Sequence, residues 1–227
     1  MKKLNYYLSK AIKKIPVLGS YQIVPRAEKF NAETFYNKTS SIPLLNTYNL
    51  TKIHYACGEN FIADWLNVDF TIKQGIIPKQ ERSKYVCSEV NLIVKHPFPD
   101  NCFSFGFAED FLEHLQQADS IVFLSECFRT LIADGVLRLS FPGLEGVLNK
   151  HYKVYDYRNT IQAKQEAYTM WEHLHFYSRE ELRLVAEQIG YRAINFVDYG
   201  VSNYPELNGL DTRKEQIGLN TYVELVK

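Results

Sequence analysis

Short apolar segments of strand length alternate with segments of helical periodicity from residue 52 to the end of the sequence. The strand-like segments are residues 52–56, 65–70, 85–92, 102–108, 136–141, 191–198 and 219–227. Helical patterns stand between several of them, in residues 110–135 and 178–190. Strands joined through helices usually return in the same direction, because parallel pairing needs a long crossover connection. The alternation therefore predicts an α/β fold, with a largely parallel sheet and helices on its faces.

Each helix-like segment carries its own periodicity and end signals. In residues 110–135, apolar side chains at i, i+3, i+7 and i+10 predict one buried face, formed by Ile121, Leu124, Phe128 and Leu131. Asp134-Gly135 is typical of the stop and turn that end a helix. In the later segment, Ser178 and Glu181 have the spacing of a capping box, and Gly190 predicts the C-terminal end.

Composition narrows the class of protein. The 227 residues carry 26 basic and 26 acidic side chains, so no overall positive charge favours binding to nucleic acid. The cysteines lack CxxC spacing and predict buried thiols in a reducing, cytoplasmic compartment; they are Cys57, Cys87, Cys102 and Cys127. No apolar run approaches the roughly 18 residues that a membrane-spanning helix needs.

The N-terminal residues 1–50 are expected to form a lead-in to a single domain that covers residues 51–227. Residues 1–29 contain seven Lys or Arg side chains and one acid, Glu28. Two interpretations remain open for a basic amphipathic helix here. It makes weak contact with an anionic membrane surface or partner, or it packs its apolar side on the domain. The sequence makes no prediction of the oligomeric state.

The turn between the first two strands constrains the ligand. In KIHYACGENFIADWLNVDF, residues 52–70, only eight residues separate the two apolar runs, and Gly58 is the one glycine between them. A dinucleotide site uses several glycines and a helix N-terminus against its pyrophosphate, whereas this turn carries Glu59. The phosphate-binding pattern GxxxxGK[ST] does not occur in the sequence. The turn therefore favours a nucleoside without phosphates, such as S-adenosylmethionine (SAM).

Three strand ends supply groups that suit such a nucleoside. Gly58 allows the backbone to approach the methionine part closely. Asp69, at the end of the second strand, can accept hydrogen bonds from both ribose hydroxyls, and Asn91, at the end of the third, can bind the adenine edge. Ligands of parallel sheets bind beyond the carboxyl ends of the strands, so these residues are expected at one edge.

Four segments, in order, resemble the class I SAM-dependent methyltransferases, in particular a type 11-like branch. ACGENFIADWLNVD resembles that branch's glycine-cysteine-glycine turn followed by GWINVD. HPFPDNCFSFGFAEDFLEHL resembles its LPFPD-x-SFD … LEHL block, and FLSECFRTLIADGVLRLSFPGLE resembles FL-x-E-x-x-R-V-L-K-P-G-G-x-L-R-I-x-x-P-x-L. HFYSREELRLVAEQIGYR resembles the helix and AGF that follow. The resemblance implies a doubly wound, mostly parallel seven-stranded sheet, with an antiparallel last strand inserted between the fifth and sixth.

The sequence departs from the family pattern at several positions. Ala56 and Asp64 replace two glycines, Ser104 replaces the aspartate of SFD, and Asn91 stands where aspartate is frequent. Residues 132–135 read Ile-Ala-Asp-Gly in place of Lys-Pro-Gly-Gly. These departures keep an alternative open, a catalytically degenerate methyltransferase-like domain that acts as a binding or scaffold protein.

The resemblance implies in-line methyl transfer from SAM to an oxygen of a small molecule or saccharide, by analogy with glycan-modifying enzymes. The candidate cofactor-binding residues are Tyr55, Ala56, Cys57, Gly58, Asp69, Phe70, Asn91, Leu92, Ala108 and Glu109. His114 and His173 are candidate general bases, because a neutral imidazole can accept a hydroxyl proton; His175 shares one side of an extended segment with His173.

The sequence predicts no metal ion in the site, with a divalent cation left open as an alternative ligand. Asp110, Glu113 and His114 have helical i, i+3, i+4 spacing and offer carboxylate oxygens and an imidazole. The competing interpretation is a set of solvated charges on a helix surface.

Residues 144–176 interrupt the alternating pattern and are rich in aromatic side chains. They include Tyr152, Tyr155, Tyr157, Tyr168, Trp171 and Phe176. An insert after the fifth strand is expected above the cofactor edge, where it forms a lid over the acceptor or, alternatively, a structural flap or dimer contact. Residues 198–213 are expected to form another wall at the entrance to the acceptor site.

Overall fold

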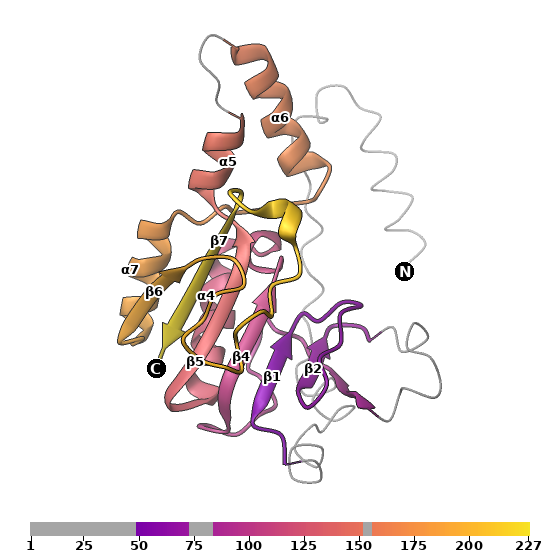
Figure 1. Cartoon of the computed structure of the whole chain (residues 1–227), viewed down its shortest axis with the longest axis vertical. Helices are drawn as coiled ribbons and strands as arrows, with labels where there is room; N and C mark the ends of the chain where they lie inside the picture. The colour runs from indigo at the N-terminus through magenta and orange to yellow at the C-terminus, as the bar shows by residue number, and fades with distance from the viewer. Residues whose placement is uncertain (1–48, 73–83, 152–155) are drawn as a thin grey trace, which may run out of the picture. The chain divides into compact units, whose positions relative to one another are not determined.

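The computed structural model describes residues 49–72, 84–151 and 156–227, which form a seven-stranded sheet with helices (Figure 1). The strand order is β3-β2-β1-β4-β5-β7-β6. The strands are β1 (Lys52–Tyr55), β2 (Leu66–Asp69), β3 (Val86–Glu89), β4 (Phe103–Glu109), β5 (Leu131–Pro142), β6 (Ala193–Val197) and β7 (Asn220–Val226). Strands β1 to β5 pair in parallel, whereas β7 pairs antiparallel with both β5 and β6. The predicted doubly wound fold, with its last strand antiparallel and inserted between the fifth and sixth, is confirmed.

One face of the sheet carries the larger hydrophobic core, under helix α4 (Gln117–Thr130) and helix α7 (Arg179–Ile189). The predicted stripe on α4 is partly wrong. Ile121 is exposed and Leu131 is already the first residue of β5, while the buried face is Ser120, Phe123, Leu124, Cys127 and Thr130. The apolar run continues from the helix into the strand without a break, so periodicity alone could not locate the boundary.

The ends of these helices test the predicted end signals. The Ser178 hydroxyl accepts a hydrogen bond from the Glu181 backbone N–H, and Gly190 ends α7 with a positive φ of 120°, both as expected. Asp134-Gly135 does not end the first helix, because α4 already ends at Thr130. These two residues instead lie within β5, where its register against β4 shifts, and Asp134 has a positive φ of 64°.

The second face carries a smaller cluster, in which residues of two loops pack on residues of β4, β5 and β7. Its buried members are Trp65, Phe107, Val136, Leu207 and Val226. Trp65 belongs to the connection between β1 and β2, in which the structure shows turns and no helix. Leu207 belongs to the segment between β6 and β7. The short crossover predicted from the eight-residue spacing thus lies against the sheet as a loop.

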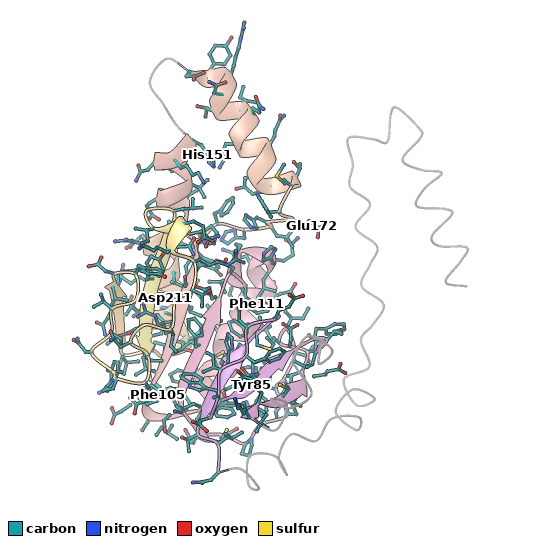
Figure 2. All side chains as sticks on the ribbon, turned by 45° about the vertical axis from the view of Figure 1, so that its right-hand side comes forward. Tyr85, Phe105, Phe111, His151, Glu172 and Asp211 are labelled. Carbon is teal, nitrogen blue, oxygen red and sulfur yellow. The ribbon has the colours of Figure 1, made fainter. Side chains whose placement is uncertain are left out.

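The polar positions in the second half of β5 are buried as well as the apolar ones. The alternation of apolar and polar residues in 136–141 predicts that one face of this strand is exposed to solvent. The Arg138 and Ser140 side chains are nevertheless at most 1% exposed. Arg138 donates to the carboxylates of Asp211 (Nε to Oδ1, 3.1 Å) and of Glu224 on β7 (Nη1 to Oε1, 2.9 Å). Asp211, labelled in Figure 2, thereby anchors the segment between β6 and β7 onto the middle of the sheet.

The insert after β5 forms helix α5 (Leu144–His151) and helix α6 (Tyr157–Thr169), which stand beyond the carboxyl end of β5 (Figure 1). Tyr152 and Tyr155 lie outside the described residues, as does the basic helix predicted in residues 1–29. Within the part of the chain that the structure describes, no helix is long and apolar enough to cross a membrane.

Candidate functional site at the carboxyl edge of the sheet

The turn that leaves β1 holds two non-glycine residues in left-handed backbone. Ala56 has φ 49°, Gly58 has φ 52°, and Asp64, at the end of the same connection, has φ 62°. Glycine adopts this region without strain, while alanine and aspartate do so at an energetic cost. Ala56 and Asp64 are the two positions in this connection where the sequence departs from glycine, so both substitutions retain the backbone shape of a glycine turn.

Asp69 ties the ends of β1 and β2 together. Its Oδ2 accepts a hydrogen bond from the Gly58 N–H at 2.9 Å, and its Oδ1 accepts one from the Phe70 N–H at 2.6 Å. Each carboxylate oxygen has about two acceptor sites. Asp69 can therefore still accept a hydrogen bond on either oxygen. A Cβ at Gly58 would meet nothing within 4 Å, so the turn is open on that side.

The other candidate cofactor residues differ in accessibility. Tyr55, Leu92 and Ala108 are at most 5% exposed, and the Tyr55 ring packs edge-on against Phe123 in the core. These residues can reach a ligand only through their backbone. Asn91 is buried, and its side-chain oxygen accepts from the Ile93 N–H at 3.1 Å. The Phe70 ring is exposed.

A first cavity of about 480 Å³ opens beside the turn, a size suited to a small ligand. Its lining comes from the β1–β2 connection, the ends of β1 and β4, Tyr85 and the segment before β7. The lining residues are His54, Ala56, Cys57, Glu59, Asn60, Phe61, Ile62, Tyr85, Phe107, Glu109, Asp110, Gly209, Leu210, Thr212 and Arg213. Three candidate cofactor residues, Ala56, Cys57 and Glu109, line it directly, whereas Gly58, Asp69 and Asn91 lie outside the lining.

Carboxylates dominate the charge of the first cavity. Burial raises the pKa of Glu109, and burial likewise raises the pKa of Asp110. Glu109 accepts from the Thr212 N–H at 2.9 Å, and Asp110 Oδ2 lies 3.3 Å from the Arg213 guanidinium. With Glu59 in the same lining, three acids face one arginine. Such a wall favours a cationic ligand over a phosphate.

A second cavity, of about 570 Å³, lies next to the first and shares Asp110 and Arg213 with it. The lining comes from the β4–α4 connection, the insert and the segment before β7. It consists of Asp110, Glu113, His114, Pro142, Val147, Lys150, His151, Met170, Trp171, His173, Phe176, Arg213, Glu215, Gln216 and Leu219. Figure 2 labels two residues of the insert, His151 at the end of α5 and Glu172 after α6.

The structure brings both candidate bases together with a buried acid. The His114 and His173 rings meet edge to face with centroids 4.9 Å apart, and His114 Nε2 lies 3.8 Å from Glu113 Oε1. Burial, followed by the nearby His114, lowers the pKa of His173 to about 4, so its ring is neutral at pH 7. Burial raises the pKa of Glu113 well above its ordinary value, and Asp110 adds to the effect.

His175, two residues beyond His173, has a different role. Its Nε2 lies 3.0 Å from Glu181 Oε1 and its ring packs on Tyr177. The backbone N–H groups of Leu174 and His175 both donate to the Glu113 carbonyl, at 2.7 and 3.2 Å. This pairing fixes the segment that carries His173 against the segment that carries Glu113 and His114.

Sequence reasoning missed Arg213, which lines both cavities, and did not bring His173 together with Glu113 and His114. Asp110 has a positive φ of 50° and precedes a 3-10 helix, η3 (Leu112–His114), so the helical i, i+3, i+4 spacing does not apply. Glu113 and His114 are instead joined by His173, which lies about 60 residues later in the sequence. No local pattern could have paired residues so far apart.

Comparison with known proteins gives a family match over part of the chain. A family model described as a methyltransferase domain matches residues 54–139. The comparison with curated proteins gives no significant match. The chain resembles solved structures at low identity, which establishes similarity of fold.

Three solved structures illustrate that similarity. A SAM-dependent methyltransferase from Archaeoglobus fulgidus has TM-score 0.51 and 14% identity, covering 86% of this chain and 97% of its own. A SAM-dependent methyltransferase from Thermotoga maritima has TM-score 0.53 and 14% identity, with the same coverage. A Haemonchus contortus phosphoethanolamine N-methyltransferase, in complex with phosphomonomethylethanolamine and S-adenosylhomocysteine, has TM-score 0.54 and 12% identity. That match covers 78% of this chain and 48% of the Haemonchus protein, so the chain spans about half its length.

Proposed function

We propose that this chain is a SAM-dependent methyltransferase that methylates an oxygen of a small molecule or saccharide. The observation that carries the proposal is the pair of adjoining cavities at the carboxyl edge of the sheet, which share Asp110 and Arg213. Methyl transfer requires two ligands whose reacting atoms meet in line, and adjoining cavities suit that requirement. The methyltransferase-domain match over residues 54–139 and the fold of the solved relatives support the same reaction class.

The first cavity and the Gly58 turn suit SAM as the cofactor. SAM carries a sulfonium and an ammonium group, and Glu59, Glu109 and Asp110 face the cavity. Their negative charges favour such cations. We assign the ribose to the remaining acceptor sites of Asp69 and the methionine part to the open side of Gly58. The backbone retained at Ala56 and Asp64 favours a working turn over a degenerate one.

The second cavity suits the acceptor, with the insert as its lid. Trp171 and Phe176 offer aromatic faces, while Lys150, His151 and Gln216 offer polar groups at the same cavity. This mixture is typical of sites that hold sugars or small ring compounds. The assignment of an oxygen acceptor rests on the imidazoles of the cavity, because a hydroxyl must lose a proton during transfer and a neutral imidazole can accept it.

The chemical step balances as an in-line displacement. The acceptor oxygen attacks the methyl carbon, the carbon–sulfur bond breaks, and its electron pair remains on sulfur to give neutral S-adenosylhomocysteine. The acceptor proton passes to a neutral imidazole, either His114 or His173. His114 is the more exposed of the pair, with 40% of its side chain accessible, and can pass the proton on to water.

Calorimetric titration with S-adenosylhomocysteine tests the cofactor assignment. We expect one site per chain, and we expect Asp69→Ala to weaken binding at least about tenfold, because the ribose loses its charged acceptor. Asp69→Asn should give a smaller loss, since its amide oxygen can still accept from the Gly58 N–H. Asp100→Ala is the control, because Asp100 lies in the loop before β4 and pairs with Arg129. Absence of binding by the wild-type chain would reject the proposal.

A further inference from the structure

We infer that Glu113, His114 and His173 form a binding site for a divalent transition-metal ion of the zinc class. One ligand atom from each residue lies within 4.8 Å of the others. The cluster is part of the wall of the second cavity, so a bound ion would face the space assigned to the acceptor.

The donor set selects the kind of ion. Two imidazole nitrogens and one carboxylate oxygen are typical ligands of zinc and neighbouring transition metals. Magnesium and calcium prefer sites made of oxygen atoms alone, which this cluster does not offer. Zinc lies about 2.0–2.2 Å from such ligands. Small side-chain rotations suffice to draw the three atoms onto one ion from their present spacing.

Buried polar atoms without partners point to the same site. Glu113 is 1% exposed, and its Oε2 has no hydrogen-bond partner among the described residues. The Nδ1 atom of His173 is also buried and unpartnered within the described part of the chain. A buried polar atom left without a partner is costly, and an unplaced ion or water is a standard explanation. A cation bound to both atoms would satisfy each of them.

The backbone holds the ligands in place before an ion arrives. The Leu174 and His175 N–H groups donate to the Glu113 carbonyl at 2.7 and 3.2 Å, which fixes the position of the His173 segment. Asp110 is outside the cluster and pairs with Arg213, so the cluster contains His173 in place of Asp110 of the alternative ligand set that the sequence offers.

The site deepens the proposed function and in this respect rests on it. Three protein ligands leave a coordination position open for an exogenous oxygen, as in catalytic zinc sites. An acceptor hydroxyl bound there has a lowered pKa and loses its proton to cavity water before its oxygen attacks the methyl carbon. The imidazoles are then ligands and no longer general bases. The acceptor class narrows to molecules with a hydroxyl group.

Cobalt(II) titration of the full-length protein, with any affinity tag removed, tests the site. We expect one equivalent of Co²⁺ to produce the visible absorption of a site with nitrogen and oxygen ligands, and Zn²⁺ to displace it. His173→Ala and Glu113→Gln should each weaken Co²⁺ binding at least about tenfold, in line with the loss of one ligand. His175→Ala is the matched control, because His175 lies in the same segment but pairs with Glu181, and it should bind like the wild type.

Two results would overturn the inference: no Co²⁺ band at stoichiometric concentration, or equal binding by the wild type and both ligand variants. Circular dichroism on each variant shows whether the fold is intact, and Glu113→Gln preserves the shape of the side chain if His173→Ala unfolds. Titration of the same samples with S-adenosylhomocysteine separates the two proposals. If the protein binds S-adenosylhomocysteine but not Co²⁺, the result contradicts only the metal site. If it binds Co²⁺ but not S-adenosylhomocysteine, the metal site is supported and the proposed methyl transfer is rejected.

Discussion

Replacement of Arg138 by methionine is expected to lower the free energy of unfolding by about 3–5 kcal/mol. The guanidinium is fully buried and donates to Asp211 and Glu224, whose side chains are at most 2% exposed. Methionine fills similar space but leaves both carboxylates buried without their cation. Removal of one partner from a buried ion pair is strongly destabilising for this reason. Urea unfolding followed by circular dichroism measures the difference.

Arg183→Met is the matched control for this prediction. Arg183 on α7 also pairs with two glutamates, Glu180 and Glu187, each at 2.6 Å, but its side chain is 39% exposed. Water can solvate those glutamates once the arginine is gone, so the urea midpoint should change little. If both variants lost the same free energy of unfolding, burial would not increase the contribution of the Arg138 ion pairs to stability.

The Arg138 network also connects the core to the first cavity. Arg138 donates to the Val201 carbonyl at 2.9 Å, and Asp211 accepts from the Gly200 N–H at 2.7 Å. The same segment contains four residues that line the cavity, Gly209, Leu210, Thr212 and Arg213. Any Arg138 variant that still folds should therefore bind S-adenosylhomocysteine more weakly than the wild type.

Acidification from pH 7 to pH 5 is expected to remove about 2 kcal/mol of stability for each of two buried histidines. Burial lowers the pKa of His54 from 6.5 to about 4, and burial lowers the pKa of His96 to about 4 as well. A folded pKa below the unfolded one means that the unfolded chain binds more protons in this range. Stability therefore begins to fall as the pH drops below 6.5, and the loss is complete below about pH 4.

The difference between the wild type and His54→Gln isolates this effect. The glutamine amide can replace the contact between the His54 ring and the Asn67 side chain, at 3.3 Å, but does not titrate. Buried Glu113 has a raised pKa, which acts in the opposite direction as the pH falls, and it is present in both proteins. Urea unfolding at pH 7, 6 and 5 should show that the variant loses about 2 kcal/mol less than the wild type. Parallel pH curves for the two proteins would contradict the assignment.

Most of the fold could be predicted because its signals are local. The capping residue Ser178, the stop at Gly190 and the alternating strand segments each act over a few residues, and each lies where expected. The end of α4 was misplaced because Leu131 continues an apolar run in which helix and strand both bury their side chains. The position of β7 between β5 and β6 was predicted from the resemblance to class I methyltransferases, because the periodicity of apolar residues does not determine the order of strands in a sheet.

The candidate site was predictable only in part, for a related reason. Residues at strand ends, such as Asp69 and Glu109, could be expected at one edge because a parallel sheet brings its carboxyl ends together. His173 and Glu113 meet through backbone hydrogen bonds between distant segments, which leave no trace in spacing. The alternating pattern of residues 136–141 indicates that the Arg138 side chain faces solvent. Its burial is explained by the carboxylates of Asp211 and Glu224, which lie far from it in the sequence.

A crystal structure of the full-length protein grown with S-adenosylhomocysteine tests the central claim most directly. Ribose hydroxyls should lie within hydrogen-bond distance of the Asp69 carboxylate, and the amino-acid part should lie on the open side of Gly58, next to the first cavity. The thioether sulfur should point toward Asp110 and the second cavity. Density for the nucleoside at another place, or none at a saturating concentration, would contradict the account.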